Sequence, residues 1–449
     1  MTSASVMSQT DWSDRFSVRA SNLKISETRA LFAVASRPEV VSLAGGMPNL
    51  KDLPLHQIAR SFQQMFEKDG ATAMQYGGGQ GLEVLREQIT DIMSLEGIHA
   101  SAANVTITAG SQHALDLVTQ LFVDPGDPIL VEAPSYVGAL SVFHSYQCDV
   151  HHVLMDQDGL IPEALEEAAT ELEKAGRPAK FLYTVPNFHN PGGMTLTEQR
   201  RPQIVDICQR HHLLILEDNP YGLLGFDGHL YPALQPLNPD GIIYLGSFSK
   251  MFAPGFRIGW ALAPDQITQK LVVANETAIL TPSMAAEMSI SKYLHDFDWY
   301  GQVDKFRVMY RGRARATLEA LKKYLPDCTW THPVGGFYTW VHFPAGLNTN
   351  AMLPRAVQNL VAYVSGTAFY ADGRGSDYLR IAYCYPPEEQ IREGIRRLAL
   401  TVEQEKALIA NGEAVSAVSI AISAELYFKS SVRGAVIFAP RLVFTSPVA

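Results

Sequence analysis

Residues 246–260 read GSFSKMFAPGFRIGW, and the interpretation of the whole chain starts from this stretch. Lys250 lies in a short Ser/Gly segment directly after the apolar run 241–245, which is typical of a β-strand. A lysine in such a place can lose its hydration, which lowers the pKa of the amine and makes it a nucleophile toward aldehydes. A surface lysine that follows a strand would give the same local pattern. Other motifs of the chain decide between these two interpretations.

The composition indicates a globular protein of about two domains. The chain has 449 residues, of which 47% are apolar and 18% are charged, and this charged fraction is low for a disordered protein. A formal net charge of −10 argues against a nucleic-acid partner. Four scattered cysteines argue against a zinc site or a disulfide framework, so no metal is expected. The polar first 21 residues and the lack of about 18 consecutive apolar residues predict no signal peptide, no membrane partner and a cytoplasmic location.

Apolar runs and helical patterns alternate from residue 46 to residue 285. Residues 104–108 predict a strand, and the runs at 129–131, 181–186 and 213–217 are apolar, as in strands buried on both faces of a parallel sheet. This pattern predicts one large α/β domain over 46–285. A helical stretch (285–323), two strand-like segments and further helices then predict a smaller α+β domain over 286–407. Residues 1–45 are expected to form an N-terminal arm with a mobile helix, and 408–449 an appended tail of unknown role.

Polar residues gather just past the ends of the predicted strands, where open α/β sheets bind ligands. Gly110, Ser111 and Gln112 join the strand 104–108 to a helix, and a helix N-terminus at such a turn can bind an anion. Asp218 directly follows the strand 213–217. Arg380 lies inside an apolar strand, where a buried guanidinium needs a partner. That partner is either an internal carboxylate or the carboxylate of a ligand held by the guanidinium fork.

Together these residues indicate one cofactor, pyridoxal 5′-phosphate. Lys250 would bind it as a Schiff base, and Asp218 would pair with the protonated pyridine nitrogen. Tyr136 offers an aromatic face, and Asn190 and Tyr221 offer donors to a phenolate. The residues expected to surround the phosphate are Gly110, Ser111, Gln112, Ser247, Ser249 and Arg257.

These motifs, in this order and spacing, resemble the class I/II aminotransferases of fold type I over roughly residues 24–405. The similarity rests on Gly110-Ser111-Gln112, Asn187-x-x-Asn190-Pro191, Glu217-Asp218-x-Pro220-Tyr221, Ser247-x-Ser249-Lys250 with Arg257, and Leu379-Arg380. Residues 43–48, LAGGMP, resemble the 2-aminoadipate and kynurenine aminotransferase subgroup most. The resemblance implies an α/β fold in which a large domain has a mostly parallel, seven-stranded-type sheet and a small α+β domain follows. It also implies a homodimer with active sites at the interface.

The resemblance also implies roles for single residues. Lys250 would carry the cofactor and move the proton between the substrate Cα and the cofactor, while Asp218 stabilises the pyridinium and Tyr136 stacks on the ring. Arg380 with Asn190 would hold the substrate carboxylate, and Gly46 would line the substrate pocket. Tyr76 would reach the phosphate of the other subunit's cofactor. Arg29 matches a mobile arginine that meets the substrate side chain, although a solvated helix residue would fit its sequence context equally well.

The resemblance predicts an aminotransferase that moves the amino group of an α-amino acid to a 2-oxo acid, with 2-oxoglutarate as the expected acceptor. The donor would be of the 2-aminoadipate, aromatic or aliphatic type. A β-lyase or decarboxylase on the same fold is the first alternative, and a non-enzymatic regulator domain is the second. The chain departs from the family pattern at Gly192, where Thr is usual, at Ser365, where Pro is common, and in its tail.

Overall fold

The computed structural model describes residues 11–23, 37–344 and 346–411. The predicted helix around Arg29 and the tail from residue 412 onward lie outside these ranges. The first described elements are α1 (Val18–Asn22) and the 3₁₀ helix η1 (Ser13–Arg15). The other 3₁₀ helices are η2 (Ala102–Asn104), η3 (Gln235–Leu237), η4 (Pro254–Phe256) and η5 (Gly366–Phe369).

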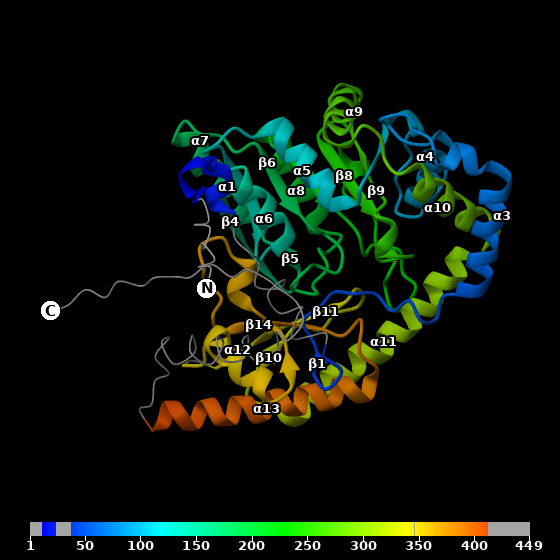
Figure 1. Ribbon diagram of the computed structural model, residues 1–449. Coiled ribbons are helices and arrows are strands. Elements are labelled where there is room, and N and C mark those ends of the chain that lie inside the picture. Colours follow the sequence, from blue (N-terminus) through cyan, green and yellow to red (C-terminus); the bar gives the residue numbers. More distant parts are fainter. Residues whose placement is uncertain (1–10, 24–36, 345, 412–449) are drawn as a thin grey trace, which may run out of the picture.

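An eight-stranded sheet forms the centre of the large unit, with the strand order β2-β9-β8-β7-β6-β3-β4-β5 (Figure 1). Neighbouring strands run parallel from β8 to β4, whereas β9 and β5 are antiparallel to their neighbours. The mostly parallel sheet is therefore confirmed, and the two-residue β5 adds an eighth strand at its edge. The strands are β2 (Val105–Thr108), β3 (Pro128–Ala133), β4 (Asp149–Asp156), β5 (Gly159–Leu160), β6 (Phe181–Thr184), β7 (Leu214–Asp218), β8 (Ile242–Ser247) and β9 (Gly259–Leu262).

Helices cover both faces of this sheet, and the central strands β3, β6, β7 and β8 are rich in apolar residues for that reason. In β6, Phe181 and Tyr183 point into one core with residues of α5, α6 and α9, while Leu182 points into the other with residues of α7 and α8. The alternation follows from the two-residue period of a strand. The bounds of these helices are α5 (Ser111–Phe122), α6 (Val137–Ser145), α7 (Pro162–Lys174), α8 (Arg200–Arg210) and α9 (Asp265–Ile279).

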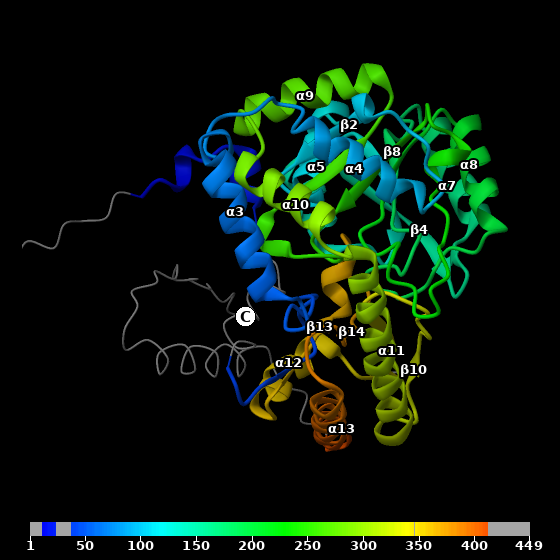
Figure 2. The ribbon, with the colours of Figure 1, turned by 90° about the vertical axis from the view of Figure 1, so that its right-hand side faces the viewer.

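The helical stretch expected over 285–323 consists of two helices, α10 (Met284–Asp296) and α11 (Trp299–Tyr324). The Asp298 side chain caps α11 by accepting a hydrogen bond from Gly301 N at 2.9 Å. α10 packs against α3 (Leu55–Ala73) and α4 (Glu83–Ser94) at the end of the large unit (Figure 2). The stretch expected to be helical is thus helical except at Phe297 and Asp298, and the apolar pattern did not indicate this break because it continues across it.

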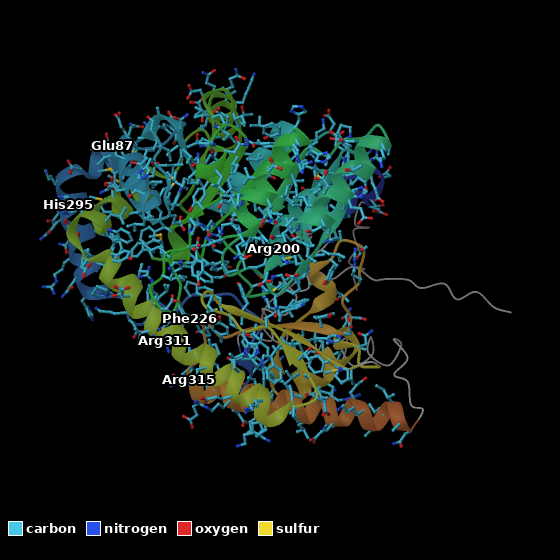
Figure 3. All side chains as sticks on the ribbon, turned by 180° about the vertical axis from the view of Figure 1, so that it is seen from behind. Glu87, Arg200, Phe226, His295, Arg311 and Arg315 are labelled. Carbon is cyan, nitrogen blue, oxygen red and sulfur yellow. The ribbon has the colours of Figure 1, made fainter. Side chains whose placement is uncertain are left out.

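α11 connects the two units. Phe306 and Tyr310 in its first half pack into the core that includes β2, β8 and β9, whereas Ala320 and Leu321 near its end pack into the core of the small unit. Phe226 packs against both cores beside α11, and its carbonyl accepts a bond from Arg311 Nη1 at 3.4 Å (Figure 3). We propose that the domain boundary lies within α11 rather than at residue 285.

The small unit contains an antiparallel sheet in the order β10-β11-β14-β13, with α12 and α13 beside it. A second, two-stranded sheet pairs β1 in parallel with β12, so residues 41–42 of the expected N-terminal arm belong to the small unit. None of the helices in the described ranges is long and apolar enough to cross a bilayer. The bounds are β1 (Val41–Ser42), β10 (Thr329–Trp330), β11 (Tyr338–His342), β12 (Val361–Ala362), β13 (Val364–Ser365), β14 (Tyr378–Ala382), α12 (Thr349–Gln358) and α13 (Glu388–Ala410).

Candidate active site

A cavity of about 420 Å³ lies where the C-terminal ends of β6, β7 and β8 meet the small unit. Twelve of the fifteen residues that the sequence analysis selected line this cavity. They are Gly46, Ser111, Gln112, Tyr136, Asn190, Asp218, Tyr221, Ser247, Ser249, Lys250, Arg257 and Arg380. The structure thus brings together residues that lie up to 334 positions apart in the chain (from 46 to 380).

Lys250 follows the end of β8 in a turn that is held by a bond from Ser249 N to Ser247 Oγ at 3.0 Å. Its Nζ donates to the carbonyl oxygen of Gly46 at 2.9 Å. Burial lowers the pKa of the Lys250 amine to about 8, and the positive charges of Arg380 and Arg257 act in the same direction. About a tenth of this amine is therefore uncharged at pH 7, far more than for an exposed lysine, and the uncharged form is the nucleophile toward an aldehyde.

Asp218 ends β7, and its side chain is only 3% exposed. Oδ2 accepts a hydrogen bond from the Tyr183 hydroxyl at 2.8 Å, whereas Oδ1 is buried without a partner. Burial raises the pKa of the Asp218 carboxyl to about 6. A buried carboxylate oxygen without a partner is costly, so this atom fits a cationic N–H group of a ligand.

An anion site lies on the other side of Lys250, at the N-terminus of α5. Gly110 has φ +88°, and a Cβ there would overlap the guanidinium of Arg257. A Cβ on Gly259 would lie 2.6 Å from Ser111 N, so both glycines let the β2–α5 turn approach β9. Arg257 is fixed by bonds from Nη2 to Ala109 O at 3.0 Å and from Nη1 to Ser249 Oγ at 3.5 Å. Hydroxyls, helix N–H groups and a guanidinium thus converge as a phosphate requires.

Arg380, on β14, is 2% exposed. Nη1 donates to Asn190 Oδ1 at 2.8 Å and Nη2 to Ala44 O at 2.5 Å, while the buried Nε has no partner. No carboxylate in the described parts of the chain lies within ion-pair distance of Arg380. Within the described residues Arg380 thus forms no internal salt bridge, and its fork can take the carboxylate of a ligand.

Tyr136 and Asn190 also line the cavity, and each is held in place by neighbouring residues. The Tyr136 hydroxyl donates to Gln112 Oε1 at 3.4 Å, which ties this ring to the first turn of α5. His189 fixes the loop that carries Asn190, because its Nδ1 accepts from Gly192 N at 3.1 Å and its Nε2 lies 3.0 Å from Glu132 Oε2.

The sequence analysis assigned no role to Tyr338, which also lines the cavity. Its hydroxyl lies 3.3 Å from that of Tyr221, and a Cβ on Gly46 would overlap it. The sequence predicts one of the two strand-like segments of the small domain at 336–341, but no motif or periodicity indicates that this strand faces the large sheet.

Two of the selected residues are not brought to the cavity by the described chain. Tyr76 is 74% exposed and does not line it, so its expected role on the other subunit's cofactor stays a prediction. Arg29 lies outside the described residues. Gly110 does not line the cavity either, but it supports the site by making room for Arg257.

The site fits pyridoxal 5′-phosphate on its own geometry. The unpartnered Oδ1 of Asp218 suits the protonated pyridine nitrogen, and the amine of Lys250 suits the aldehyde. The anion site at α5 suits the phosphate. The aromatic ring of Tyr136 and the hydroxyl of Tyr221 supply a stacking face and a donor.

Comparisons with known proteins agree with this assignment. A family model described as "Aminotransferase class I and II" matches residues 38–398. The chain is 38% identical to the aromatic-amino-acid aminotransferase 1 of Thermococcus litoralis, over 88% of this chain and 95% of the relative. It is 34% identical to the 2-aminoadipate transaminase of Thermus thermophilus, over 90% of this chain and 100% of the relative.

A solved structure shows the same fold. The kynurenine aminotransferase of Pyrococcus horikoshii, crystallised in complex with PMP, superposes with a TM-score of 0.83 and is 37% identical, over 87% of this chain and 98% of that one. The resemblance expected from the motifs is confirmed. The chain belongs to the class I and II aminotransferases and is a pyridoxal-phosphate-dependent transaminase.

Proposed function

We propose that this enzyme moves the amino group of an α-amino acid of 2-aminoadipate, aromatic or aliphatic type to a 2-oxo acid, with 2-oxoglutarate as acceptor. One observation carries the proposal: the amine of Lys250, the free Oδ1 of Asp218 and the free Nε of Arg380 belong to residues that line a single cavity. The substrate class is supported by relatives named for aromatic amino acids, 2-aminoadipate and kynurenine.

Each residue has a distinct task in this proposal. Pyridoxal phosphate, when bound, supplies the electron sink that makes the substrate Cα–H acidic. Arg380 and Asn190 bind the substrate carboxylate and so orient the Cα–H bond. Lys250 would move the proton between the substrate Cα and the cofactor. Asp218 keeps its charge beside the ring nitrogen and holds a proton there.

Transamination is favoured over the alternatives. The relatives at 34–38% identity reported above are all named as aminotransferases or transaminases. A β-lyase or decarboxylase would use the same lysine and aspartate, so the site residues alone do not separate these reactions. Transamination, β-elimination and decarboxylation give different products, so identifying the products distinguishes the three reactions.

We further propose that the enzyme works as a homodimer. Large apolar side chains are exposed on one surface, which we call the Tyr76 surface and define as Met74, Tyr76, Val273 and Leu280. Two close approaches show that the segment after Met74 lies beside the segment 276–284: a Cβ on Gly77 would overlap Met284, and one on Gly79 would overlap Glu276. Met74 is 78% exposed, and such a surface fits a second copy of the chain.

The test is a half-reaction. A suitable amino acid alone should convert the bound cofactor to its amine form, and added 2-oxoglutarate should reverse this with formation of glutamate. Release of ammonia or carbon dioxide without that conversion would contradict transamination. Lys250→Ala should show no conversion, because no other lysine of the described ranges lines the cavity. The matched control Lys292→Ala, which removes a surface ion pair with Asp296, should behave like the wild type.

A further inference from the structure

We infer that Tyr338 is a positioning residue of the transamination reaction, with separate tasks for its ring and its hydroxyl. The ring holds the guanidinium of Arg380, and the hydroxyl orients and strengthens the hydroxyl of Tyr221 as a hydrogen-bond donor. This inference rests on the proposed function, because it requires that Arg380 and Tyr221 act on the substrate and the cofactor.

The position of the ring follows from the pairing of two strands. In the antiparallel pair β11–β14, Trp340 is the direct partner of Arg380, and Tyr338 lies two residues before Trp340 in β11. Residues two apart on a strand share a face, so the ring of Tyr338 is a diagonal neighbour of Arg380. The guanidinium carbon lies 4.4 Å from the centre of this ring and 5.0 Å from that of Phe369.

These aromatic faces compensate an unusual burial. Arg380 is 2% exposed, and its hydrogen-bond partners within the described chain are two neutral oxygens, those of Asn190 and Ala44. The negative faces of aromatic rings attract a desolvated guanidinium, which offsets part of the cost of its burial. Tyr338 therefore orients Arg380 without a carboxylate that would compete with the substrate.

The hydroxyl of Tyr338 lies close to both Tyr221 and Gly46. It is 3.3 Å from the Tyr221 hydroxyl, and it occupies the space that a side chain at Gly46 would need. The carbonyl of Gly46 in turn accepts the bond from Lys250 Nζ. Tyr338 itself is 2% exposed, so its hydroxyl has little water to bond with.

A hydroxyl that accepts a hydrogen bond becomes a better donor. When Tyr221 donates to the phenolate oxygen of the cofactor, its own oxygen is free to accept from Tyr338. A donor to this phenolate favours the state in which the Lys250 nitrogen has lost its proton, because the protonated nitrogen would otherwise serve as that donor. Loss of the Tyr338 hydroxyl should thus raise the pKa of the Lys250 nitrogen in the holoenzyme.

A variant that tests the Tyr338 hydroxyl must leave the other groups that act on Lys250 and Tyr338 in place. The groups that act on Lys250 are Asp218, Arg257, Arg380 and Cys384, and those that act on Tyr338 are Arg380, Cys384 and Tyr221. Tyr338→Phe leaves all of them in place and keeps the ring. The matched control is Tyr363→Phe, which removes a buried hydroxyl that donates to Thr349 O at 2.6 Å in the core of the small unit.

The first experiment is a spectrophotometric pH titration of the bound cofactor in four holoenzymes: wild type, Tyr338→Phe, Tyr221→Phe and the double variant. We expect Tyr221→Phe to raise the pKa of the Lys250 nitrogen strongly and Tyr338→Phe to raise it by about half a unit. In the double variant, Tyr338→Phe should add nothing. Tyr363→Phe should titrate like the wild type.

The outcomes separate this inference from the proposed function. No shift in Tyr221→Phe would contradict the assignment of the site itself. A shift in Tyr221→Phe with none in Tyr338→Phe, or additive shifts in the double variant, would overturn the role of the Tyr338 hydroxyl alone.

The second experiment tests the ring through the Michaelis constant. Tyr338→Phe keeps the aromatic face, so KM for the amino acid should stay within about twofold of the wild type. Tyr338→Leu removes the face and should raise KM about threefold or more. Equal KM values in Tyr338→Leu and the wild type would overturn the role of the ring. If the Leu variant does not fold, the titration of the Phe variant still decides the role of the hydroxyl.

Discussion

Among single residues, Arg380 sets the orientation of the substrate in the proposed reaction. Its Nη1 and Nη2 are already bonded within the protein, and its Nε is buried and free. Arg380→Lys keeps a positive charge but loses the planar fork, and with it at least one charge-assisted bond worth about 1.5–3 kcal/mol. We therefore expect KM for both the amino acid and the 2-oxo acid to rise about 10- to 100-fold in steady-state kinetics. Arg374→Lys, which changes an exposed pair with Asp372 and a contact with the Tyr370 ring outside the cavity, is the control. Unchanged KM values would mean that the carboxylate binds elsewhere.

Asp218 acts on chemistry more than on binding. Asp218→Asn keeps an oxygen that can accept from the Tyr183 hydroxyl but removes the charge that holds a proton on the ring nitrogen. We expect kcat to fall about 100-fold or more, while the affinity for the cofactor changes much less because the phosphate contacts remain. Single-turnover rates and a cofactor titration measure the two quantities. A collapse of affinity at a nearly normal rate would contradict this role.

At this scale the sequence predicted what depends on strand ends. Lys250, Asp218 and Asn190 follow apolar runs, and in a parallel sheet the ends of such runs meet at one edge. The partner of Arg380 could not be predicted, because only the fold shows that no described carboxylate reaches it. Tyr338 was missed for a similar reason, since its place beside Arg380 depends on the pairing of β11 with β14.

Among the elements, a buried polar network braces the end of β7 from behind the site. Glu96, which follows α4, accepts from the Tyr244 hydroxyl at 2.5 Å and from Asn219 Nδ2 at 2.9 Å. Asn187 donates to Asn219 Oδ1 at 3.2 Å and accepts from Arg201 Nη2 at 2.7 Å. The network thus joins the segment after Asp218 to the loop that carries Asn190. No periodicity or motif indicated it, because its members come from five separate segments.

The network gives the stability of the enzyme a pH dependence. Burial raises the pKa of the Glu96 carboxyl from 4.5 to about 8, so the folded state binds this proton more tightly than the unfolded state does. The resulting stabilisation is complete below pH 4.5 and is lost as the pH rises through 8. Glutamine does not titrate, so the melting temperature of Glu96→Gln relative to the wild type should rise from pH 5.5 to pH 8. The underlying change is about 1 kcal/mol per pH unit.

This prediction needs a control at an exposed position. Glu87, on the surface of α4 (Figure 3), is suitable, and Glu87→Gln measured over the same pH range shows what the substitution does at an exposed position. A difference for Glu96→Gln that does not change with pH would show that Glu96 has the same charge in the folded and unfolded states.

For the whole molecule, the cavity lies between two hydrophobic cores, and residues of both units line it. The large unit contributes Lys250 and Asp218, and the small unit contributes Tyr338 and Arg380. The α/β order of the large unit was readable from the alternation of apolar runs. The two-unit division was readable only approximately, because α10 continues the apolar pattern although it packs on α3 and α4.

The proposed homodimer can be tested through Tyr76, which is exposed on the Tyr76 surface. If Tyr76 acts on the partner's site, a heterodimer of a Lys250→Ala chain and a Tyr76→Phe chain has one site with both residues intact. That site should bind the cofactor with wild-type affinity and give about half of the wild-type kcat, because only one of two sites can react.

The companion heterodimer pairs a doubly substituted chain with a wild-type chain. Its only reactive site lacks the Tyr76 hydroxyl and should bind the cofactor more weakly, by about 10-fold for one lost charge-assisted bond. Differently tagged chains allow both heterodimers to be purified and titrated with cofactor. The reverse ranking of the two affinities would place Tyr76 at the site of its own chain, and equal affinities would remove it from the site altogether.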